Sequence, residues 1–115
     1  MTVNYRTGDS QARPWGTWEV LDTGDQYALK KLVIHPGKGI SLQVHEHRDE
    51  HWVVVSGTGQ LRLNNTERQV CTNEHVFIHT GDVHQITNDG LTDLVLIEVQ
   101  WGQLLDETDI NRINI

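Results

Sequence analysis

The chain has 115 residues, which is enough for one domain with a buried core but not for two. With 37% hydrophobic and 22% charged residues, it has the composition of a folded globular protein rather than a disordered one. The formal net charge of -7 argues against binding to a nucleic-acid backbone, which calls for a basic face. A small phosphorylated ligand is still compatible with this charge, because two or three well-placed cations would hold it.

The cysteine content and the hydropathy pattern limit where the protein works. The single cysteine, Cys71, excludes an internal disulfide and a structural zinc site built on cysteine pairs. No N-terminal stretch resembles a signal peptide, and no run approaches the roughly 18–20 apolar residues of a membrane span. We therefore expect a cytoplasmic protein without a membrane segment.

Short β-branched runs separated by turn residues recur along the chain, and helical periodicity is nearly absent. Residues 1–12 are polar and are expected to form a loose N-terminal arm that precedes the domain, residues 13–115. The predicted strands cover residues 18–21, 27–35, 40–45, 51–56, 60–63, 67–72, 76–79, 84–87 and 94–99. Only residues 104–110 have the pattern of a short helix. So many short strands bury their apolar faces best in a closed barrel, which makes the predicted fold all-β.

Four residues in the middle of the chain have metal-ligand chemistry. Gln43 and His45 are two residues apart on one predicted strand, so their side chains leave from the same face. Glu50 begins the next strand after a short turn, and His84 begins a later one. We predict that these four side chains hold a divalent metal ion. Zinc is the first candidate for this donor set, and manganese, iron, nickel and cobalt are the others.

The spacing around these residues resembles the signature of the cupin superfamily. One segment reads Pro-Gly, five residues, Gln43, one residue, His45, four residues, Glu50, six residues and Gly. The other reads His79-x-Gly-x-x-His84-x-x-x-Asn. Gln43 stands where a first histidine is usual, and His79 stands where a proline is usual. The resemblance implies a single cupin (jelly-roll) β-barrel with the metal inside it.

His47 offers a second way to read the first segment. If His45 and His47 are taken as the His-x-His pair, only two residues precede Glu50, fewer than the signature requires. We therefore prefer Gln43 and His45 as ligands and keep His47 as an alternative ligand. On the preferred reading, His47 shares the strand parity of the ligands without binding the metal.

Longer segments are similar to the type II mannose-6-phosphate isomerase domain. They are Arg-Pro-Trp-Gly at 13–16, Ser-Leu-Gln-Val-His-Glu-His-Arg at 41–48, the run at 50–58 and Leu-Ile-Glu-Val-Gln at 96–100. The similarity extends from about Arg13 to Arg112, with departures at Glu46, Asp49 and the last five residues. This domain usually forms the C-terminal part of bifunctional mannose-1-phosphate guanylyltransferases. Guanylyltransferase activity is not expected of 115 residues.

The resemblance implies interconversion of mannose 6-phosphate and fructose 6-phosphate through an enediol. This reaction moves a proton between C1 and C2, so it needs a base that titrates near neutrality and a Lewis acid, here the metal. His47 is the first candidate for the base, followed by Lys30 or Lys31, of which only one can point inward from its strand. Arg48 is the candidate to hold the phosphate or the enediolate.

Two other functions are compatible with the same barrel. A non-catalytic sugar- or sugar-phosphate-binding module is favoured by Glu46, Asp49 and the C-terminus, which is short of the usual ending of the isomerase domain. Acidic residues on both sides of Arg48 would weaken phosphate capture. A metal-dependent dioxygenase is disfavoured by Gln43, since a more nitrogen-rich ligand set would be expected. By analogy with other cupins, we also expect a homodimer.

Overall fold

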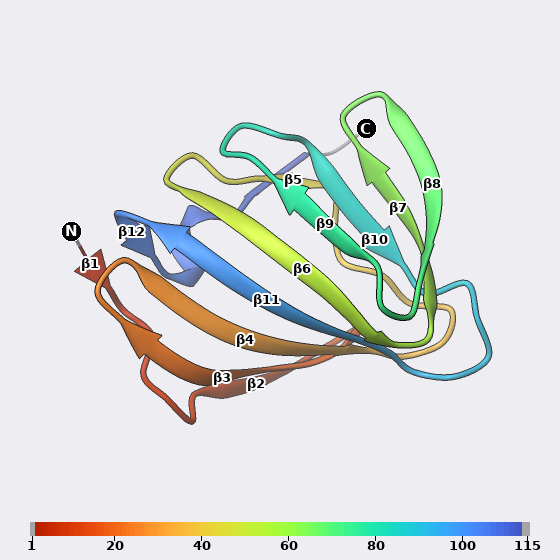
Figure 1. The fold of residues 1–115 in the computed structure, drawn as a ribbon, viewed down its shortest axis with the longest axis horizontal. Coiled ribbons are helices and arrows are strands. Elements are labelled where there is room, and N and C mark those ends of the chain that lie inside the picture. The colour runs from red at the N-terminus through yellow and green to blue at the C-terminus, as the bar shows by residue number, and fades with distance from the viewer. Residues whose placement is uncertain (1, 114–115) are drawn as a thin grey trace.

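The computed structural model describes residues 2–113 and consists of short strands arranged in layers (Figure 1). The strands are β1 (Thr2–Val3), β2 (Ser10–Arg13), β3 (Gly16–Gly24), β4 (Tyr27–Ile34), β5 (Gln43–Val44), β6 (Arg48–Ser56), β7 (Thr58–Leu63), β8 (Thr66–Cys71), β9 (His75–Ile78), β10 (His84–Thr87), β11 (Leu94–Gly102), β12 (Leu104–Leu105) and β13 (Asn111–Arg112). A single 3-10 turn, η1 (Glu107–Asp109), lies between the last two. Within residues 2–113, no helix is long and apolar enough to cross a membrane.

Two main sheets form the barrel. The larger has the strand order β2-β3-β4-β11-β6-β9, and the smaller has the order β13-β5-β10-β7-β8. Figure 1 shows β3, β4, β11 and β6 side by side as one long curved layer, with β7, β8 and β10 gathered at one end of it. Strands far apart in sequence become neighbours, because β11 lies between β4 and β6. The prediction of an all-β jelly-roll barrel is confirmed.

Alternation along the strands places apolar residues at one end of the interior and polar residues at the other. On β11 the inward positions begin with Leu94 and Leu96 and continue with Glu98 and Gln100, all of them buried. The neighbouring strand β6 runs the opposite way, so its polar inward residues, Arg48 and Glu50, lie beside the polar end of β11. The same end of the barrel therefore collects every charged inward residue of these two strands.

The N-terminal segment is not the loose arm that its composition predicts. β2 pairs with β3, β1 pairs with β12, and Tyr5 is buried in the hydrophobic core, where it meets Trp18 edge-on. Residues 10–12 are polar or small because β2 is an edge strand with exposed side chains. This pairing ties the segment before residue 13 to the barrel.

The predicted helix at 104–110 is reduced to the single turn η1. Leu104 and Leu105 instead form a strand that pairs with β1, so the turn begins only after Asp106, whose side chain caps it by accepting a hydrogen bond from the backbone N–H of Thr108. The short run of polar residues that follows is too brief for an α-helix.

Candidate metal centre

His45, Glu50 and His84 meet at the polar end of the barrel interior. Their ligand atoms all lie within 4.8 Å of one another, and all three side chains are buried. Nε2 of His45 is 3.1 Å from Nε2 of His84 and 3.2 Å from Oε2 of Glu50. The three come from the loop after β5, from β6 and from β10, so only the folded barrel brings them together. They form a triad that could hold a metal ion.

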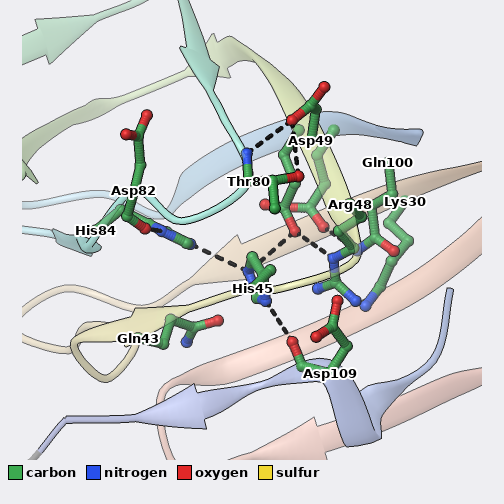
Figure 2. A network of polar contacts seen from close by, with 12 residues as sticks. Lys30, Gln43, His45, Arg48, Asp49, Thr80, Asp82, His84, Gln100 and Asp109 are labelled. Carbon is green, nitrogen blue, oxygen red and sulfur yellow. Dashed lines mark hydrogen bonds and ion pairs between the residues drawn. The ribbon is translucent and has the colours of Figure 1, made fainter. Parts of the chain in front are cut away.

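The orientation of the two imidazole rings fits a cation at this point. Nδ1 of His45 is 2.6 Å from the carbonyl oxygen of Asp109, and Nδ1 of His84 is 2.9 Å from that of Asp82 (Figure 2). A carbonyl oxygen only accepts, so each Nδ1 carries its proton and each Nε2 of a neutral ring presents a lone pair. Burial lowers the pKa of His45 to about 4, which keeps this ring neutral near pH 7. Two lone pairs and a carboxylate therefore converge, as metal ligands do.

Gln43 lies beside the triad as the cross-strand partner of His84. Its side-chain nitrogen, Nε2, donates to the backbone oxygen of Ser41 at 3.2 Å, and the residue is 9% exposed. This contact uses the amide nitrogen, so the amide oxygen is the atom of Gln43 that could serve as a ligand. Figure 2 shows Gln43 next to His45. The four predicted ligand residues thus lie in one region, and coordination by Gln43 stays a prediction.

Arg48 and Trp52 hold the carboxylate of Glu50 from two sides. Nε of Arg48 donates to Oε2 of Glu50 at 2.8 Å, and Nε1 of Trp52 donates to Oε1 at 2.9 Å. Burial opposes charge on both partners of the ion pair, but their mutual attraction prevails, raising the pKa of Arg48 and lowering that of Glu50. Arg48 also donates through Nη1 to the backbone oxygen of Asp106 at 3.0 Å. The guanidinium predicted to hold a phosphate is therefore already engaged with the protein.

A cavity of about 510 Å³ opens beside the triad. Glu50 and His84 line it, together with Gln43 and Trp52, so its contents would touch the candidate metal centre. A volume of this size suits a small molecule. The lining also includes charged residues from several strands and from η1, which are Arg13, Lys30, Arg48, Glu98, Glu107 and Arg112.

His47 does not lie where its strand parity predicts. Its side chain is exposed, and it is not among the described residues that line the cavity. β5 ends at Val44 and β6 begins at Arg48, so residues 45–47 form a loop in which the alternation of a strand does not hold. Asp109 anchors this loop by accepting from the backbone N–H of both Glu46 and His47. The expected place of His47 on the ligand face is therefore wrong.

The structure distinguishes the two lysines that the sequence left open. Lys30 points inward and is 4% exposed, whereas Lys31 is exposed on the outer face. Nζ of Lys30 is 3.2 Å from Oε2 of Glu107 and 4.2 Å from the centre of the Trp18 ring. Of the two candidates, only Lys30 lines the cavity.

The acidic neighbours of Arg48 point away from the cavity. Glu46 is exposed, and Asp49 accepts hydrogen bonds from the backbone N–H and the hydroxyl of Thr80 at 2.7 and 3.0 Å. Neither lines the cavity in the described structure, so neither would contact an anion bound there. The part of the sequence argument for a non-catalytic module that rests on Glu46 and Asp49 is therefore not supported.

Sequence reasoning missed Glu98, a buried carboxyl on β11 that lines the cavity. Burial raises its pKa to about 7 and the Glu50 carboxylate adds to the rise, whereas Lys30 and Arg48 oppose it. Gln100 donates from Nε2 to Oε1 of Glu98 at 2.8 Å. A signal was present, because Glu98 continues the inward parity of a strand whose first inward residues, Leu94 and Leu96, are apolar.

Known proteins are similar to this chain in sequence and in fold. The family model described as the mannose-6-phosphate isomerase C-terminal domain matches residues 3–115. Mannose-1-phosphate guanylyltransferase 2 from Escherichia coli O157:H7 is 43% identical over 100 residues, which cover 87% of this chain and 21% of that protein. The chain thus spans about a fifth of the length of the curated relatives that it matches.

Solved structures agree on the barrel. The capsular polysaccharide assembling protein CapF from Staphylococcus aureus has a TM-score of 0.79 at 25% identity, over 92% of this chain and 34% of that one. An uncharacterized conserved protein with a double-stranded β-helix domain from Klebsiella pneumoniae has a TM-score of 0.74 at 18% identity, over 98% and 91%. The second likeness supports the fold alone. Since the family model covers nearly the whole chain, the chain belongs to the mannose-6-phosphate isomerase C-terminal family of cupin barrels.

Proposed function

We propose that this domain is a metal-dependent aldose–ketose isomerase that interconverts mannose 6-phosphate and fructose 6-phosphate. The observation that carries the proposal is the buried triad of His45, Glu50 and His84, two of which line a cavity of about 510 Å³. A site of this size would admit a hexose phosphate and bring it against the metal ligands. The family of the chain makes this sugar chemistry the first one to test.

The residues that would hold the metal are Gln43, His45, Glu50 and His84. Zinc is the first candidate, followed by manganese, iron, nickel and cobalt. When bound, the ion supplies a Lewis acid that polarises a sugar oxygen. The protein contributes the orientation of the ligands, because the Asp109 carbonyl fixes the ring of His45 as Arg48 and Trp52 fix the carboxylate of Glu50.

Proton transfer between C1 and C2 is assigned to Glu98 with Lys30 beside it. The two residues are cross-strand neighbours on β11 and β4, and both line the cavity. A carboxyl whose pKa is about 7 can both accept and return a proton near neutral pH. The ammonium of Lys30 is placed to offset negative charge on the substrate. This pair takes the role predicted for His47, whose side chain lies outside the cavity.

The decisive experiment is a coupled assay of mannose 6-phosphate conversion. The purified protein is stripped of metal, reloaded separately with zinc, manganese or cobalt, and followed for production of fructose 6-phosphate. The variant His84→Ala removes one of the predicted metal ligands and should lose both bound metal and activity. If no metal supports turnover, the isomerase proposal fails. Saturable binding of fructose 6-phosphate without turnover would instead support a sugar-phosphate-binding module.

We also propose that the domain works in the cytoplasm as a homodimer. β9 is an edge strand of the larger sheet, and Val53, Val55 and Phe77 on β6 and β9 are 43%, 48% and 40% exposed. An open edge beside apolar surface favours association of two copies. Cys71, an exposed free thiol, is compatible with a reducing compartment. Sedimentation equilibrium at micromolar concentration tests the dimer, and a monomer would contradict it.

A further inference from the structure

The cavity concentrates positive charge in an acidic protein. Although the net charge of the chain is -7, four of its nine lysine and arginine residues line this one cavity. They fall into two groups. Lys30 and Arg48 are 4% and 3% exposed and are bonded to carboxylates of the protein. Arg13 and Arg112 are more exposed and therefore lie toward the opening of the cavity.

Arg112 is directed to the cavity by its place in the sheet. It is the cross-strand partner of Gln43 on β13 and β5, and directly opposed residues of an antiparallel pair leave the sheet on the same face. Within residues 2–113, no carboxylate oxygen lies within 4.0 Å of its guanidinium nitrogens. Its charge is therefore not neutralised by the described part of the chain.

Arg13 approaches the cavity from the facing sheet, at the end of β2. Gly16 permits the turn that brings it there, because a Cβ at that position would collide with the carbonyl oxygen of Val33. Nη2 of Arg13 is 3.6 Å from Oε1 of Glu107, but Oε2 of the same carboxylate is 3.2 Å from Nζ of Lys30. One carboxylate thus faces two cations, and among residues 2–113 Arg13 has no carboxylate to itself.

The cavity is consequently lined by two guanidinium groups, one from each sheet, that are not each matched by a carboxylate of their own within the described structure. This matches a phosphate monoester, which carries close to two negative charges at neutral pH, and guanidinium groups are suited to its oxygens because they donate in a planar fork. Arg48 lacks this freedom, since its Nε and Nη1 already donate to Glu50 and to the Asp106 backbone.

We propose that Arg112 and Arg13 hold the phosphoryl group of the hexose 6-phosphate while the carbonyl end of the sugar faces Gln43 and the triad. This inference rests on the proposed function and names how the same cavity selects a phosphorylated sugar. On this proposal Arg48 orients the carboxylate of Glu50 and is a positioning residue. The sequence had instead suggested Arg48 as a ligand of the phosphate.

The test is the binding of fructose 6-phosphate and of unphosphorylated fructose to the metal-loaded protein, by isothermal titration calorimetry. It needs no turnover. Arg112→Gln and Arg13→Gln should each weaken fructose 6-phosphate binding about tenfold, the effect of losing one charge-assisted hydrogen bond. Bound metal and fructose affinity should stay unchanged. Arg68→Gln is the matched control, because Arg68 is an exposed β8 arginine paired with Glu74, and it should bind both sugars as the wild type does.

Competition by inorganic phosphate gives a second readout, and its inhibition constant should rise in both cavity variants but not in the control. Wild-type affinity for fructose 6-phosphate in both cavity variants would overturn the inference. So would equal weakening for both sugars, or a wild type that does not prefer the phosphorylated one. A third result is a wild type that prefers the phosphorylated sugar, variants that do not, and no turnover with any metal. In that case the phosphoryl site stands and only the isomerase proposal fails.

Discussion

Replacing Asp109 by alanine should weaken metal binding without removing a metal ligand. Asp109 is 3% exposed, and its carboxylate accepts from the backbone N–H of Glu46 and of His47, each at 3.0 Å. These two bonds fix the loop that carries His45. The backbone oxygen of Asp109 also receives the Nδ1 proton of His45 at 2.6 Å, so movement of η1 would turn the imidazole away from Glu50 and His84.

The structure sets the expected size of the effect. A hydrogen bond to a charged acceptor contributes about 1.5–3 kcal/mol, and Asp109→Ala removes two of them. Glu46 and His47 are exposed, so their freed N–H groups can bond to water, and the lower value applies to each bond. The free energy of unfolding should therefore fall by about 3 kcal/mol. Disturbing the group that orients a histidine ligand lowers metal affinity about 10–100-fold.

Two measurements check this prediction. Urea unfolding of the metal-free protein gives the loss of stability, and zinc or cobalt titration against a competing chelator gives the affinity. Asp106→Ala is the matched control, because Asp106 caps the same turn but its side chain does not contact the loop of His45. The control should lose about 1 kcal/mol and keep its metal affinity. The reasoning is refuted if Asp109→Ala binds metal as tightly as this control.

Three further predictions follow from the same centre. Arg48→Met should lower the unfolding free energy of the metal-free protein by about 3–5 kcal/mol, because it leaves the carboxylate of Glu50 buried without its partner; an unchanged urea midpoint would contradict this. Gln43→Ala should reduce bound zinc, measured by mass spectrometry, whereas His47→Ala should spare it, and the reverse result would show that the ligand register is wrong. Since the pKa of Glu98 is raised from 4.5 to about 7, the native state keeps a proton that the unfolded state releases between these values, so stability should fall as pH rises through that window. This change in unfolding free energy is on the order of 3 kcal/mol, and Glu98→Gln should remove most of it. Urea midpoints of the metal-free protein at about pH 5 and pH 8 measure the change, and an equal change in the wild type and the variant would contradict the prediction.

Local pattern was sufficient for the barrel and for the core of the candidate centre. Strand alternation with frequent turns predicted an all-β fold, because each short strand must bury one face against another sheet. The spacing of His45, Glu50 and His84 resembles the cupin signature, and that resemblance predicted that they would meet; the structure brings their ligand atoms within 4.8 Å of one another. The spacing is informative about side-chain direction, because it fixes where each strand begins relative to the turn before it and hence which residues point inward.

Tertiary structure decided what alternation cannot specify, namely where a strand stops and which strands face one another. His47 turns outward because residues 45–47 leave the sheet, and Lys30 rather than Lys31 turns inward because of the register of β4 against β11. Arg13 and Arg112 come from opposite ends of the sequence, and no local period relates them. They line one cavity because β2 and β13 belong to the two main sheets of the barrel, an arrangement set by long-range pairing.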